Sequence, residues 1–175
     1  MDKKIIITIP HYNNPVGLIN TISSINDPIK IDIVITDDGS EIKLDEHQVR
    51  SKYNNKGNIH FIYLDKNYGV GIAANKCLEY VKNKSYKYVA RLDAGDISYK
   101  NKFSKQIEFL EKNNQIMLVG TWARVLDNEG NLLFYIKHPT DHSNIKRKMY
   151  LNSMFVNPTV LFKTSILETV SEYPI

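Results

Sequence analysis

The sequence predicts an α/β fold with a mostly parallel sheet flanked by helices. Four runs of β-branched and other apolar residues alternate with segments whose apolar residues recur at helical spacing. Short polar loops join these segments, which is the pattern of successive strand–helix units with right-handed crossovers. The chain has 175 residues, of which 42% are hydrophobic and 24% charged, so we expect one globular domain spanning residues 1–175.

The first half is expected to contain four strand–helix units. Residues 4–9 form an apolar run without polar alternation, as in a strand buried on both faces, and Pro10 is expected to end it. Apolar residues between Pro15 and Asp27 recur at helical spacing. Three more units follow, with strands expected at 31–36, 59–64 and 88–92 and helices at 44–52, 70–81 and 103–110.

The pattern changes after Ile116, where we expect a mixed sheet. Residues 128–131 are typical of a hairpin turn between two short strands at 124–127 and 132–136. The other elements expected in this part are a strand at 117–119, a helix at 143–150, a strand at 159–162 and a helix from Thr164.

Charge and cysteine content exclude several classes of protein. The 23 basic and 19 acidic residues give a net charge of +4, and the lysines are scattered, so we expect no nucleic-acid partner. The single Cys77 cannot form an internal disulfide, so we expect a reducing compartment. Its position on an apolar helical face predicts a core residue. The apolar run near Met1, about five residues long, is too short for a signal peptide. No stretch reaches the length of a membrane span, so we expect a cytoplasmic location.

Polar residues cluster where the predicted parallel strands end. The four loops are His11–Asn14, Asp37–Ser40, Asp65–Gly69 and Asp93–Asp96. Ligands of open parallel sheets bind beyond the carboxyl ends of the strands. We therefore expect carboxylates, amides and an aromatic ring to gather in one crevice.

Asp93 and Asp96 are candidate metal ligands. Ala94 and Gly95 between them are small, so both carboxylates could turn toward one hard cation such as Mg²⁺ or Mn²⁺. An isolated Asp-x-x-Asp is also common as an ordinary turn, because Asp and Gly favour turns. Both interpretations are open at this point.

The Asp37–Ser40 loop also has two interpretations. It could be a simple turn in which Ser40 caps a following helix. One cap cannot account for both Asp37 and Asp38, however. At least one of these acids is therefore expected to be free to accept hydrogen bonds from a base or a ribose.

The Gly69–Ala74 segment supports a different function. It matches the G-x-G-x-x-[GA] dinucleotide fingerprint, and Asp93 follows about twenty residues later. The fingerprint should follow its strand directly, whereas Asp65–Tyr68 intervene, and it leaves the Asp37–Asp38 pair and Asp96 without a role. A NAD- or flavin-binding oxidoreductase domain is therefore the alternative function.

The histidines and the tryptophan give weaker signals. His11 could contact a ligand, or it could be a hydrogen-bonded loop residue. Trp122 could form a platform for an acceptor, although packing is the default for an aromatic side chain. The remaining histidines lack metal-ligand spacing and are assigned to the surface or to structure: His47, His60, His138 and His142.

The strand-end segments together carry a family resemblance. Ile-Pro-His-Tyr-Asn at 9–13, Asp-Asp-Gly-Ser at 37–40, residues 67–75 and Arg-Leu-Asp-Ala-Gly-Asp at 91–96 resemble the nucleotide-sugar domain of family 2 glycosyltransferases, which have the GT-A fold. Asn157–Lys163 resembles the acceptor-side region of the same family. The resemblance covers essentially the whole chain.

The resemblance implies a transferase that moves a sugar from a nucleoside diphosphate, expected to be UDP, to an acceptor hydroxyl with inversion. Such an enzyme would depend on Mn²⁺ or Mg²⁺ and serve polysaccharide or glycoconjugate synthesis. By the family pattern, Pro10, Tyr12 and Asp38 would lie around a uracil-type base, and Asp93 near the ribose and sugar. The full expected set is Pro10, Tyr12, Asp38, Asn67, Arg91 and Asp93 for the donor and Asp96 for the metal.

The sequence departs from the family pattern at its end. An inverting transferase needs a general base, which in this family follows a Tyr-Pro-like segment. Here the chain ends at Tyr173-Pro174-Ile175, so we expect the base beyond Ile175 and a fragment that binds donor but transfers sugar poorly. A non-catalytic nucleotide-binding module would then describe the fragment. The acceptor would be a saccharide or a lipid-linked saccharide, and a lipid-linked acceptor would place the parent protein at the inner face of the membrane.

Overall fold

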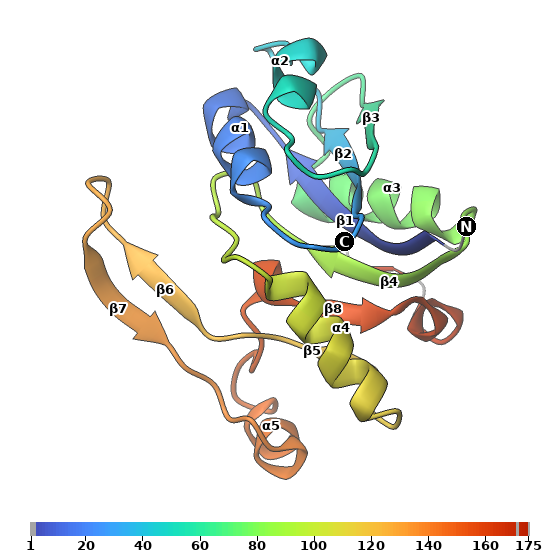
Figure 1. Cartoon of the computed structure of the whole chain (residues 1–175), viewed down its shortest axis with the longest axis vertical. Coiled ribbons are helices and arrows are strands. Elements are labelled where there is room, and N and C mark those ends of the chain that lie inside the picture. The colour runs from blue at the N-terminus through green and yellow to red at the C-terminus, as the bar shows by residue number, and fades with distance from the viewer. Residues whose placement is uncertain (1–2, 171, 175) are drawn as a thin grey trace.

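The computed structural model describes residues 3–170 and 172–174 and confirms the α/β class (Figure 1). A six-stranded sheet has the order β3-β2-β1-β4-β8-β5, and β6 and β7 form a separate two-stranded ribbon. Figure 1 shows that this ribbon projects away from the sheet. The architecture is therefore one layered sheet with an outlying arm.

The first four strands are parallel to one another, and helices connect them. The strands are β1 Lys3–His11, β2 Asp32–Asp37, β3 Ile59–Tyr63 and β4 Tyr86–Arg91. The helices are α1 Pro15–Ser24, α2 Glu46–Ser51, α3 Val70–Lys82 and α4 Lys102–Lys112. These elements begin and end within two residues of the expected positions, except that α1 ends at Ser24, three residues before Asp27.

Both faces of the sheet are buried, which explains the apolar runs without polar alternation. Ile5, Ile7 and Ile9 of β1 belong to a core cluster that contains residues of α1, α2 and α4. Ile6 of the same strand belongs to a second cluster, with residues of α3. The alternation along the strand therefore divides the core into two layers.

Cys77 lies in the second core layer, as expected. Its side chain is 0% exposed, and its Sγ lies 3.1 Å from the hydroxyl of Thr36 on β2. Burial raises the pKa of the thiol to about 11, so the side chain stays protonated at neutral pH.

Strand β1 continues past Pro10 to His11, so the prediction that Pro10 ends it is wrong. The carbonyl of Thr8 accepts a hydrogen bond from the backbone amide of Leu92, next to β4. The carbonyl of His11 accepts one from the backbone amide of Asp38, next to β2. Successive peptide groups point to opposite sides of a strand, so the nitrogen of Pro10 points toward β4. Pairing with β4 ends at Thr8, so that side needs no donor from residue 10.

The C-terminal part makes the sheet mixed, as expected. Strand β8, Leu161–Lys163, pairs antiparallel with β4 and with β5, Leu118–Val119. The hairpin ribbon consists of β6 Ala123–Leu126 and β7 Leu132–Ile136, and helix α5 covers His142–Lys148.

Two predictions for this part need correction. The strand expected at 159–162 begins only at Leu161, because Pro158 sits at the start of a 3₁₀ turn, Asn157–Thr159. The helix expected from Thr164 is a 3₁₀ helix of five residues, Thr164–Glu168, without a side-chain cap.

Candidate functional site

The loops after β1, β2, β3 and β4 lie together at one edge of the sheet, as predicted. The amide of Asn13 donates to the Ser40 hydroxyl at 2.9 Å, which joins the first two loops. The side-chain amide of Asn14 donates to the carbonyl of Ala94 at 3.1 Å, which joins the first loop to the last. We call this place the strand-end crevice, formed by residues 10–14, 37–40, 64–69 and 91–96.

His11 and Asp37 form a buried pair at the base of the crevice. They are 2% and 5% exposed, and His11 Nδ1 lies 2.7 Å from Asp37 Oδ2. The backbone amide of Asn14 donates to His11 Nε2 at 3.2 Å. Because Nε2 is then an acceptor, the ring proton resides on Nδ1 and is donated to Asp37. Of the two interpretations of His11, the structure therefore shows the hydrogen-bonded structural residue.

Asp38 fixes the loop that follows β3. Its Oδ1 accepts from the Tyr68 amide at 2.9 Å and its Oδ2 from the Gly69 amide at 2.8 Å, and the residue is 2% exposed. Gly39 makes this approach possible, since its φ is +67° and an added Cβ would lie 2.2 Å from the carbonyl carbon of Lys66.

Asp37 and Asp38 both have partners within the protein, and the expectation that one of them accepts from a base or a ribose stays a prediction. Asp37 accepts from His11 and from the Ser40 amide, and Asp38 accepts from two amides of the next loop. Ser40 does not cap a helix, because the N-cap of α2 is Asp45. Apart from the Ser40 amide, these partners belong to loops distant in sequence, which is why local pattern could not reveal them.

Three predicted donor residues differ in how far they reach solvent. Pro10 is buried within β1. Tyr12 is 45% exposed on the first loop, and Asn67 is exposed on the third loop. Tyr12 and Asn67 are thus accessible to a ligand at the same edge.

Arg91 and Asp93 form an ion pair at the end of β4. Arg91 is 4% exposed, and its Nε and Nη2 both lie 3.1 Å from Asp93 Oδ1. The guanidinium also lies 5.2 Å from the centre of the Tyr173 ring. Both nitrogens bind one carboxylate oxygen, and the Asp93 side chain is 40% exposed, so it can still approach a ligand.

Asp96 lies at the exposed rim of the crevice, beside Lys102 of α4. Partial desolvation, and then the negative charge of Asp93, raise the pKa of Asp96. Burial lowers the pKa of Lys102 to about 8, while Asp96 acts in the opposite direction, and Lys102 Nζ donates to the carbonyl of Pro158 at 3.2 Å. Lys102 was not identified from the sequence.

The two carboxylates fit a hard cation that takes its other ligands from substrate and water. Desolvation and, after it, the charge of Asp93 raise the pKa of Asp96, and a bound cation would favour the ionised carboxylate against both effects. Across the described ranges 3–170 and 172–174, no group of three His, Cys, Asp or Glu side chains could hold a metal ion. Mg²⁺ and Mn²⁺ suit such a site, because they commonly keep water and phosphate oxygens as ligands.

The glycine segment does not sit where a dinucleotide fingerprint should. Strand β3, which precedes it, is at the edge of the sheet, and β3 ends at Tyr63 while α3 begins at Val70. Gly69 has a φ of +96° and serves as the N-cap of α3, and its amide binds Asp38. The segment therefore belongs to the strand-end crevice.

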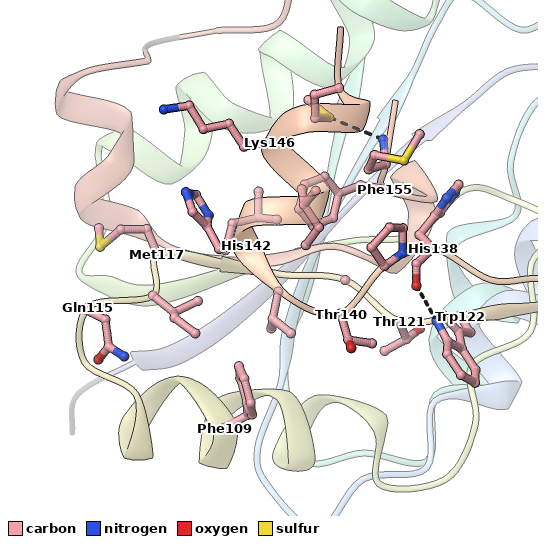
Figure 2. A pocket seen from close by; sticks show the side chains of 18 of the residues that line it. Phe109, Gln115, Met117, Thr121, Trp122, His138, Thr140, His142, Lys146 and Phe155 are labelled. Atoms are coloured by element: carbon pink, nitrogen blue, oxygen red, sulfur yellow. Dashed lines mark hydrogen bonds between the residues drawn. The ribbon is translucent and has the colours of Figure 1, made fainter. Parts of the chain in front are cut away.

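A separate apolar cavity of about 1150 Å³ lies between α4, β5 and α5 (Figure 2). Trp122 lines it and donates from Nε1 to the carbonyl of His138 at 2.9 Å. Its titratable lining residues are His138, His142, Lys146 and Tyr150. Sequence reasoning singled out Trp122 but not this cavity, because its walls come from four separate segments.

The remaining histidines agree with a surface or structural assignment. His47 is exposed on α2, and the His60 ring packs against Tyr80 with 5.1 Å between ring centres. Among the helices of the described residues, none is long and apolar enough to span a membrane.

Comparison with known proteins identifies similar chains. The family model described as "Glycosyl transferase family 2" matches residues 6–170. An uncharacterized glycosyltransferase of Methanocaldococcus jannaschii is 29% identical over 175 residues, covering 96% of this chain and 59% of that protein.

Solved structures share the fold. TarS 1–349 of S. aureus in complex with UDP-GlcNAc aligns with a TM-score of 0.67 and 19% identity, over 98% of this chain and 48% of that one. A mannosyltransferase of Pyrobaculum calidifontis in complex with GDP-Man and Mn²⁺ aligns with a TM-score of 0.67 and 16% identity, over 99% and 48%. The chain thus spans about half the length of these three proteins.

The lowered pKa of Lys102 predicts a pH-dependent stability. Between about pH 8 and its ordinary pKa of 10.5, the unfolded chain binds more protons at this residue than the folded chain. The penalty for burying the ammonium is complete below pH 8 and vanishes above 10.5. Urea unfolding should therefore show wild type gaining stability relative to Lys102→Met as the pH rises from 8 to 10. Lys105→Met, on the exposed side of α4, should follow wild type, and a parallel pH response of all three proteins would refute the prediction.

Proposed function

The chain belongs to glycosyltransferase family 2, and from this premise we propose that it binds a UDP-sugar in the strand-end crevice for transfer to an acceptor hydroxyl. The transfer would proceed with inversion and depend on Mn²⁺ or Mg²⁺, in polysaccharide or glycoconjugate synthesis. The observation that supports this most strongly is the position of Asp93 and Asp96 at the end of β4, beside the loop that presents Tyr12.

The base of the donor fits the loops after β1, β2 and β3. The exposed ring of Tyr12 offers a stacking face for a pyrimidine. Each carboxylate oxygen of Asp38 binds one backbone amide and retains a second lone pair, which can accept from an N–H of the base. Pro10, buried in β1, is proposed to lie beneath the base. Asn67, exposed on the third loop, can hydrogen-bond the ribose or the base.

The diphosphate and sugar fit the loop after β4. A divalent cation held by Asp96 would act as a Lewis acid on the leaving nucleoside diphosphate. Asp93 is oriented by two nitrogens of the buried Arg91, and its exposed side can bind the ribose or the sugar. Arg91 in this proposal contacts the donor through Asp93.

The general base is proposed to lie outside the described residues. The acids of the crevice have other roles: Asp37 pairs with His11, Asp38 with the β3–α3 loop, Asp65 with Tyr68 and Asp93 with Arg91, while Asp96 is assigned to the cation. We therefore expect the chain of 175 residues to bind donor but to transfer sugar slowly, as a nucleotide-binding module would.

The acceptor is proposed to be a saccharide, either free or linked to a lipid, and the apolar cavity favours the lipid-linked form. The last turn of α5 carries Lys146, Arg147 and Lys148, which can attract an anionic lipid phosphate. Tyr150 and Leu151 directly after this helix are 86% and 88% exposed. A lipid-linked acceptor would bring the parent protein, from the cytoplasmic side, to the inner face of the membrane.

Calorimetric titration with UDP tests the donor site. We expect wild type to bind UDP more tightly with Mn²⁺ than without it, and Asp96→Asn to lose that difference, because the variant loses the carboxylate charge that holds the cation. Glu129→Gln, in the hairpin between β6 and β7, removes one acid elsewhere and should behave as wild type. Binding of NAD without metal, together with no response to UDP, would overturn the proposed function.

The fluorescence of Trp122 tests the acceptor cavity, because Trp122 is the single tryptophan of the chain and lines this cavity. Titration with farnesyl phosphate should change the emission of Trp122 in a saturable way. Ile145→Asp, which places a charge in the apolar lining, should weaken the response at least tenfold, an order-of-magnitude expectation for a buried charge. Val16→Asp, at a 68% exposed site on α1, is the control. An unchanged emission in wild type would refute lipid binding at this cavity.

A further inference from the structure

Helix α1 holds the acidic loop after β4 through side chains that the donor site does not use. Asn14, at the N-cap of α1, donates to the carbonyl of Ala94. Thr21 in the middle of the helix accepts from the amide of Gly95 at 2.9 Å. Ser24, at its last residue, accepts from the amide of Ser98 at 2.9 Å. Three positions along one helix thus bind three backbone groups of one loop, two on the peptide between Ala94 and Gly95 and one on the peptide before Ser98.

Thr21 makes the central contact. Its side chain is 0% exposed, and its hydroxyl lies 3.0 Å from the carbonyl of Gly17 and 3.3 Å from the carbonyl of Asp93. A hydroxyl has one proton and two lone pairs, so it can donate to one of these carbonyls while accepting from Gly95. The hydroxyl therefore contacts the peptide groups on both sides of Ala94.

The loop needs this external support because its own bonding is slight. One bond closes the turn, from the Asp96 amide to the Asp93 carbonyl at 3.1 Å. Gly95 has a φ of +114°, a conformation that side-chain-bearing residues rarely adopt, and its amide points at Thr21. Without the hydroxyl, that amide would lose a partly buried hydrogen bond whose acceptor, Thr21, is fully buried.

We infer that Thr21 is a positioning residue for the divalent-cation site: its hydroxyl holds the turn that sets Asp93 and Asp96 relative to each other. This inference rests on the proposed function. Asn14 supports the same turn from its Ala94 side. The backbone amide of Asn14 also donates to His11. The start of α1 therefore holds both sides of the crevice: the side proposed for the nucleotide base and the side proposed for the cation.

Substitution of Thr21 by Val removes the hydroxyl and keeps the shape of the side chain. We expect Thr21→Val to weaken Mn²⁺ binding in saturating UDP about five- to tenfold, as loss of a buried hydrogen bond predicts. The Mn²⁺ dissociation constant is read from the paramagnetic resonance signal of the free ion. Binding of UDP without metal should change less than about twofold, since no contact of Thr21 reaches the base side.

Two variants serve as matched controls. Thr21→Ser restores the hydroxyl and should return Mn²⁺ affinity close to that of wild type. Ser23→Ala removes an exposed hydroxyl of the same helix, one that donates only within α1, to Ile19, and should leave both affinities unchanged. Amide hydrogen exchange gives a readout without metal: Thr21→Val should accelerate exchange at Gly95 but not at Ser98, which Ser24 holds.

The outcomes separate this inference from the proposed function. Wild type that binds no Mn²⁺ in the presence of UDP overturns the proposed function and, with it, the inference. Wild type that binds Mn²⁺ while Thr21→Val binds it equally well overturns the inference alone. Equal loss of metal-free UDP binding and Mn²⁺ binding in Thr21→Val also overturns it, because that result indicates general destabilisation. If Thr21→Val does not fold, Asn14→Ser, which keeps a capping hydroxyl but loses the Ala94 contact, must show weaker Mn²⁺ binding.

Discussion

The strand-end crevice depends on the buried carboxylates of Asp37 and Asp38. A buried charge is costly unless it is hydrogen-bonded, and both acids meet that demand with partners from neighbouring loops. Asp37 binds His11 and the Ser40 amide, and Asp38 binds the amides of Tyr68 and Gly69. The bonds to His11, Tyr68 and Gly69 tie the end of β2 to the loops after β1 and β3, so the first three loops are held as one unit.

Helix α1 extends this organisation to the fourth loop. The N-cap of α1, Asn14, is the last residue of the first loop. The polar side chains of Asn14 and Thr21 hold the turn that carries Asp93 and Asp96. The core fixes α1 itself, since Leu18 and Ile22 are fully buried against the sheet. Packing of one helix face thus places both the base side and the cation side of the crevice, and substitution in that core should affect both.

The sequence predicted the repeated strand–helix units because apolar runs and helical spacing are local signals. It also placed the four polar loops at one edge, since parallel strands share their carboxyl end. The roles of Thr21, Ser24 and Lys102 could not be predicted, because each is defined by a contact far away in the chain. The same limit applies to the partners that Asp37 and Asp38 find in other loops, and to Pro10, whose fit depends on where β4 stops pairing.

The most direct test of a cation site after β4 is the broadening of backbone amide resonances by Mn²⁺. On addition of substoichiometric Mn²⁺ with UDP, the signals of Ala94, Gly95 and Asp96 should disappear first, those of Tyr12 and Asn67 should weaken, and that of Gly130 in the hairpin should persist. An excess of Mg²⁺ should restore the lost signals. Broadening centred elsewhere, or spread evenly over the chain, would contradict the account.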